Sequence, residues 1–119
     1  MLRPNSPELN AYLHRAPIDM RAGRNRLATL VREVIQQDPF QPAFFIFTNK
    51  RFDAIKLLVW DINGYGLYHK VIESREKFHW PRLFQEEVVQ MSSEQLCWLM
   101  DGYDVWSRPH KPVTFTHVS

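Results

Sequence analysis

The sequence predicts an α+β domain, in which an antiparallel β-meander of four to five strands carries one long helix packed on it and a short C-terminal helix. Three observations predict this class. A hairpin signal joins two apolar runs, apolar residues recur at the helical period ahead of it, and a helix-start pattern follows it. The chain has 119 residues, of which 45% are hydrophobic, and this is enough for one core.

The hairpin signal is Asn63-Gly64, since both residues tolerate positive φ and suit a two-residue turn. Residues 55–60 before it are apolar except at Lys56, which predicts a central strand. Residues 66–72 are expected to fold back beside them as an antiparallel partner. Gly64→Val is then expected to strain the turn.

Three further strands complete the predicted meander. Residues 11–14 form a short strand, residues 43–48 form an apolar one that opens after Pro42, and residues 78–80 form a short edge strand that Pro81 ends.

Two helices are predicted from different signals. Asp19 occupies an N-cap position before residues 21–37, and Asp38-Pro39 stops that helix. Its apolar positions follow the 3.6-residue period and form one stripe: Leu27, Leu30, Val31, Val34 and Ile35. The second helix follows a capping box that opens at Ser92, and Gly102 is its expected C-cap.

The domain organisation follows from composition. Residues 1–10 are expected to be a loose lead-in, residues 11–106 a single domain, and residues 107–119 a mobile tail with two prolines and no acid. No apolar run is long enough for a membrane span, and the N-terminus lacks a signal-peptide core. Cys97 is the one cysteine, which favours a reduced, cytoplasmic protein.

The sequence shows no signature of catalysis. It has no nucleophile motif, no phosphate loop and no clustered histidines, so we expect no enzyme activity, no metal and no cofactor. Asp61 follows an apolar strand, as the first carboxylate of a nuclease would, and Asp19 is a conceivable second ligand. Both have ordinary alternatives, Asp61 before a turn and Asp19 as a helix cap.

The cations are unevenly distributed. Residues 1–82 carry a balance of +5 and residues 83–119 a balance of −3. A basic body permits contact with phosphate without requiring it. The candidate phosphate contacts lie in a turn, at the helix start and on two strands: Arg21, Arg24, Lys50, Arg51, Lys56 and Lys70.

Aromatic residues concentrate in one part of the chain, between Trp60 and Trp80. They form either a packed core face or an exposed patch for protein contact or base stacking. Trp80 is the candidate contact residue of this group.

Several short motifs carry a resemblance to a known family. In chain order they are Asp19-Met20-Arg21, Asp38-Pro39-Phe40, Phe47-Thr48-Asn49-Lys50-Arg51, Lys56-Leu57-Leu58, Trp60-Asp61, Asn63-Gly64-Tyr65, Lys70 and Phe78-His79-Trp80-Pro81. Over residues 11–106 the chain resembles the second-reading-frame accessory protein, called TnpB, of insertion sequences of the sixty-six family. It departs from the pattern in turns, most clearly at Phe52, where the family usually has Gly.

The resemblance implies an accessory, non-catalytic role in DNA transposition, beside a transposase that carries the strand-transfer chemistry. Two mechanisms remain open. In one, the protein helps assemble the complex of transposase and element ends through weak DNA contact. In the other, it is an interaction module that docks on the transposase without binding DNA. The implied partners are the transposase, other proteins of the element and element-end DNA, and the sequence leaves the oligomeric state open.

Overall fold

Five strands form one mixed sheet in the order β4-β3-β2-β1-β5 in a computed structural model that describes residues 9–107. The strands are β1 (Asn10–His14), β2 (Ala43–Thr48), β3 (Ala54–Asp61), β4 (Gly64–Val71) and β5 (Val88–Ser92). The α+β class is confirmed. Nearly all of the predicted lead-in (1–10) and tail (107–119) lies outside the described residues.

The middle of the sheet is the predicted meander. Strand β3 pairs antiparallel with both β2 and β4, and Trp60 lies opposite Tyr65 in the predicted hairpin. The other edge differs, because β1 runs parallel to β2 and antiparallel to β5. A parallel pair needs a crossover, and the first helix supplies it. Residues 88–92 were not expected as a strand, since β5 is short and its partner lies far away in sequence.

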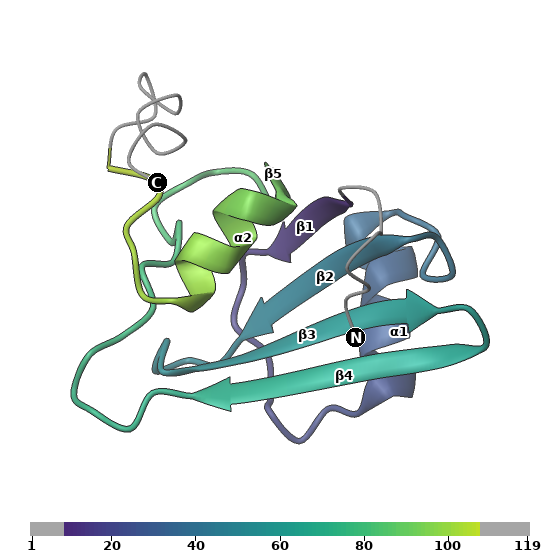
Figure 1. Ribbon diagram of the computed structural model, residues 1–119, viewed down its shortest axis with the longest axis horizontal. Helices are drawn as coiled ribbons and strands as arrows, with labels where there is room; N and C mark the ends of the chain where they lie inside the picture. The colour runs from purple at the N-terminus through teal and green to yellow at the C-terminus, as the bar shows by residue number, and fades with distance from the viewer. Residues whose placement is uncertain (1–8, 108–119) are drawn as a thin grey trace.

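The sheet is covered on both faces (Figure 1). Helix α1 (Arg24–Leu30) lies behind it in that view. Its Leu27 and Leu30, with Val31 of the following turn, share one core cluster with residues of β1, β2 and β3. Helix α2 (Ser93–Met100) lies in front and packs through Leu96 and Leu99. Strands β2 and β3 are buried over most of their length because both faces are covered.

The first helix is shorter than predicted. It starts at Arg24 after Gly23, which offers no side-chain cap, and continues as a π-helical turn over Val31–Ile35. Gln36 ends it with φ of 60°, in the left-handed region. Asp19 is therefore not a helix N-cap. Its carboxylate instead accepts from the backbone N–H of Arg21, which is a local Asx turn.

Two local predictions are wrong. The turn of the hairpin is Ile62-Asn63, one residue earlier than expected, and Gly64 begins β4 without positive φ and with open space around its Cα. The strain expected for Gly64→Val therefore has no basis. Residues 78–80 are not a strand, although Phe78 and Trp80 are both buried against the core.

The second helix forms after its predicted capping box, but its C-cap is Asp101 instead of the expected Gly102. The Ser92 hydroxyl accepts from the N–H of Gln95, and the Gln95 side chain accepts from the N–H of Ser92, which completes the capping box. Gly102 follows the helix with φ of 97°. No helix among residues 9–107 is long and apolar enough to cross a membrane.

Candidate functional site

The turn between β2 and β3 presents two cations on a fixed backbone. The Asn49 side chain accepts from the N–H groups of Asp53 and Ala54, both at 3.2 Å, and donates to the Asp53 carboxylate at 2.7 Å. That bond, assisted by Arg51 and Lys77, lowers the pKa of Asp53. Lys50 is exposed at the tip, as is Arg51. These polar side-chain bonds hold the turn in one conformation.

The same turn holds Phe52 in an unusual conformation. Its φ is 58°, in the left-handed region that bulky side chains rarely occupy. Its carbonyl accepts from the N–H of Phe78, and its ring packs against the core cluster on the α2 face. Position 52 therefore does require positive φ, and the surrounding bonds hold Phe52 there.

Further cations surround the turn. The Lys77 ammonium donates to the Arg51 carbonyl at 2.6 Å. Arg21 forms a bidentate pair with the Asp19 carboxylate, with its closest contact at 2.7 Å. The Arg21 hydrogen bonds, with Lys50 nearby, lower the pKa of Asp19 to about 2. One end of the sheet thus carries Lys50, Arg51 and Lys77. Arg21 is paired with Asp19, and Arg51 Nε lies 3.8 Å from the Asp53 carboxylate.

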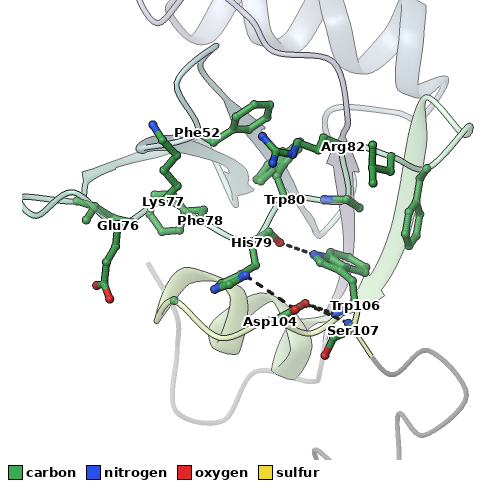
Figure 2. A pocket seen from close by; sticks show the side chains of 15 residues that line it. Phe52, Glu76, Lys77, Phe78, His79, Trp80, Arg82, Asp104, Trp106 and Ser107 are labelled. Carbon is green, nitrogen blue, oxygen red and sulfur yellow. Dashed lines mark hydrogen bonds and ion pairs between the residues drawn. The ribbon is translucent and has the colours of Figure 1, made fainter.

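Beside this turn lies a groove of about 590 Å³. Its walls come from the turn, from the segment 76–84 and from the chain after α2, and Figure 2 shows Phe52 and Arg82 facing it from one side and Trp106 from the other. The Phe84 and Trp106 rings meet edge to face with centroids 5.5 Å apart. The groove is therefore largely aromatic.

The polar groups of the groove fall into two sets. The Asp104 Oδ1 accepts from the N–H groups of Trp106 and Ser107, and its Oδ2 lies 3.9 Å from His79 Nδ1. Within residues 9–107 the Arg82 guanidinium makes no hydrogen bond or ion pair, and it lies 5.5 Å from the centre of the Phe52 ring. Arg82 is thus a cation held by a ring and open to a ligand.

The other predicted contact residues have structural roles or lie apart. Lys56 is buried, and its ammonium donates to the carbonyls of Met20 at 2.5 Å and Ala22 at 2.8 Å. Lys70 donates to the Met100 carbonyl at the end of α2. Trp80 is buried, with its indole N–H bound to the Arg15 carbonyl. Arg24 is exposed in the first turn of α1.

Sequence reasoning missed most of the groove. Lys77 and Arg82 lie just outside the predicted edge strand at residues 78–80, and Phe84 and Trp106 carried no motif. The one usable signal was Phe52, a bulky residue where a turn is expected to need Gly.

Asp19 and Asp61 lie towards opposite ends of β3, since Asp19 neighbours Lys50 and Asp61 ends the strand. Among residues 9–107, no three His, Cys, Asp or Glu side chains are grouped to hold a metal ion.

A second aromatic group lies at the opposite end of β3. The Phe40, Trp60 and Tyr65 rings are in mutual contact, with centroids 4.8 to 5.8 Å apart, and about half of Phe40 is exposed. Ile62 lies in the adjacent turn with 69% of its surface exposed. We call Phe40, Trp60, Ile62 and Tyr65 the hairpin-end patch.

Comparison with known proteins decides the family. The profile of the family described as IS66 Orf2 like protein matches residues 9–110. The chain belongs to the IS66 Orf2-like family. Members are accessory proteins of insertion-sequence transposition, so the resemblance drawn from the motifs is confirmed.

Two relatives from Sinorhizobium fredii (strain NBRC 101917 / NGR234) are similar over nearly the whole chain. The uncharacterized protein y4jC is 37% identical over 98 residues, 82% of this chain and 81% of its own length. The uncharacterized protein y4hO is 28% identical over 108 residues, 91% of each chain. No solved structure matches this IS66 Orf2-like protein significantly.

Proposed function

We propose that this protein is a non-catalytic accessory factor of transposition that helps assemble the complex of transposase and element-end DNA through weak DNA contact. It acts in the cytoplasm with the transposase and other proteins of the same element. The DNA contact is made by the turn at residues 49–53 and Lys77, which we call the basic end of the sheet.

One observation carries this proposal. Lys50 and Arg51 protrude from a turn whose backbone is fixed by Asn49, and Lys77 is anchored to the same turn. Because the cations start from fixed positions, little conformational entropy of the backbone is lost when they meet phosphates. A contact of so few charges is weak, independent of base sequence and strongly dependent on salt.

The test is duplex binding at several salt concentrations. The slope of log affinity against log salt is expected to be about −0.9 per phosphate contacted. The double variant Lys50→Ala, Arg51→Ala is expected to reduce that slope by up to about 2, with unchanged sequence preference. A matched control is Arg26→Ala with Arg32→Ala, which removes the same charge from exposed positions of the α1 segment. The proposal would be contradicted if the control variant reduced the salt slope as much as the Lys50, Arg51 variant does. It would also be contradicted if the wild-type protein did not bind duplex DNA at low salt.

The hairpin-end patch supports the alternative, a module that docks on the transposase through protein contact. Exposed aromatic groups with apolar neighbours are typical of protein interfaces. Phe40→Ser is expected to abolish co-purification with the transposase if this alternative holds, while Lys50→Ala with Arg51→Ala leaves co-purification intact. If Phe40→Ser left co-purification intact and the Lys50→Ala, Arg51→Ala variant abolished it, the DNA mechanism would be favoured.

A further inference from the structure

We propose that the groove beside the basic end binds an unpaired base of single-stranded DNA. This inference rests on the proposed function and deepens it, because it names the form of DNA that the protein takes. The base enters between Phe52 on one side and the Phe84–Trp106 pair on the other, while Arg82 and Lys77 meet the flanking phosphates.

The size and lining of the groove fit a planar aromatic guest. Its volume of about 590 Å³ lies within the roughly 300–1,000 Å³ typical of small-ligand sites, and the aromatic side chains of Phe52, Phe84 and Trp106 are among its lining residues. Aromatic side chains bind bases by stacking, with little preference for sequence, because every base has a π-face. A duplex cannot use such a groove, since its bases remain stacked and paired inside the helix.

The charges favour a nucleic acid over an uncharged guest. Asp104 is occupied by two backbone N–H groups and His79, whereas Arg82 has no ionic or hydrogen-bonded partner among residues 9–107. An arginine held over a ring at the edge of an aromatic groove keeps its N–H groups available to a phosphate. Because Glu76 and Asp104 also line the groove, Arg82 and Lys77 offer local cationic contacts to a phosphate rather than a net positive charge.

Continuity with the basic end gives the strand a path. Phe52 lines the groove and follows Lys50 and Arg51 directly in the same fixed turn, and Lys77 joins the two by its bond to the Arg51 carbonyl. A strand whose flanking phosphates meet Arg82 and Lys77 can therefore continue along the turn towards Lys50 and Arg51. This combination of a stacking platform and a cationic track is the usual design of single-strand binding sites.

A competing guest is an apolar side chain of a protein partner. Leu83 lines the groove and is 91% exposed, which would suit such a contact. We favour the base because the groove is aromatic on both walls and its unpartnered polar group is cationic. Protein docking in the groove is accordingly one result that would overturn the proposal.

The test uses tryptophan fluorescence of the full-length protein with a ten-residue oligothymidylate and with a duplex of equal length at low salt. We expect the oligothymidylate to quench fluorescence, and Trp106→Phe to remove that quenching. Phe84→Leu keeps the apolar volume but removes the ring, and it is expected to weaken binding at least about fivefold. The matched control is Tyr103→Leu, which removes an exposed ring that does not line the groove. Thermal melting shows which variants are folded.

The results separate this inference from the proposed function. Salt-dependent duplex binding that needs Lys50 and Arg51, without any oligothymidylate binding sensitive to Phe84→Leu, overturns the groove and leaves the proposed function. Single-strand binding that Phe84→Leu weakens, without duplex binding, supports the groove and removes the proposed duplex contact. Loss of transposase co-purification in Phe84→Leu, with no oligothymidylate binding in the wild type, overturns the inference in favour of a protein guest.

Discussion

The two ends of β3 carry the same backbone feature and support it differently. Before the strand, Phe52 has φ of 58°, and after it, Ile62 has φ of 59°. The first lies in a turn that Asn49 clamps and that packs on the core. The second lies in a tight turn closed by one bond from the Asn63 N–H to the Asp61 carbonyl, with its side chain exposed. The end that we assign to DNA contact is therefore the one whose strained residue, Phe52, is held by hydrogen bonds and core packing.

The largest effect is expected at Lys56, which supports the first end from within β3. Lys56→Met removes a cation whose bonds satisfy the Met20 and Ala22 carbonyls, and hydrogen bonds to charged groups contribute about 1.5–3 kcal/mol each. We expect the free energy of unfolding to fall by about 2–4 kcal/mol, measured by chemical denaturation. The exposed Lys50→Met should change it by less than about 0.5 kcal/mol. Equal effects of the two variants would mean that Lys56 is not buried.

The next effect concerns the clamp itself. Asn49→Ala removes three hydrogen bonds of the turn, and each contributes on the order of 1 kcal/mol. We expect a loss of about 2 kcal/mol in unfolding free energy, together with weaker DNA binding by the folded protein, because Lys50 and Arg51 lose their fixed positions. Unchanged DNA affinity in the folded variant would show that the rigid backbone does not matter for binding.

The comparison between the two strained residues can be tested directly. Ile62→Gly is expected to raise the unfolding free energy by about 0.5–1 kcal/mol, because a left-handed conformation costs a β-branched residue more than Gly loses in entropy. Phe52→Gly relieves the same strain but deletes a ring packed on the core, so we expect a net loss of about 1–2 kcal/mol. Thermal melting of both variants checks this. If both substitutions changed the unfolding free energy in the same direction, the two ends of β3 would be equivalent in this respect.

What the sequence could predict depended on how local the causes are. The hairpin at β3 and β4, the capping box at Ser92 and the apolar stripe of α1 all arise from residues close in sequence, and all three formed. The start of α1 shifted because Lys56 holds carbonyls 34 and 36 residues earlier in the chain. No local pattern reveals that contact. Strand β5 was missed for the same reason, since its partner β1 lies at the other end of the domain.

The candidate site was predicted in part. Lys50 and Arg51 were found because a turn must expose its tip, while Lys56, Lys70 and Trp80 were named by residue type alone and have bonds inside the fold. The groove draws on three segments between Phe52 and Ser107, so only the folded chain brings them together. The type of a residue indicates which contacts its side chain can make. Whether that side chain is accessible to a partner depends on its packing in the folded protein.

The smallest effect concerns Arg21, which lies beside the basic end and forms a bidentate ion pair with Asp19. Its hydrogen bonds hold the pKa of Asp19 at about 2 instead of 3.8, so Arg21→Ala is expected to return the carboxyl titration towards 3.8 in an NMR pH series. Because the folded pKa is lowered, the pair contributes its stability above pH 3.8 and loses it as the pH falls through about 2. Both groups are exposed, so the change in stability is small. Arg21→Ala should likewise reduce the salt slope of DNA binding less than Lys50→Ala does, because phosphate must compete with Asp19 for the guanidinium. An equal reduction would show that the ion pair opens on binding and that Arg21 acts together with the three cations of the basic end.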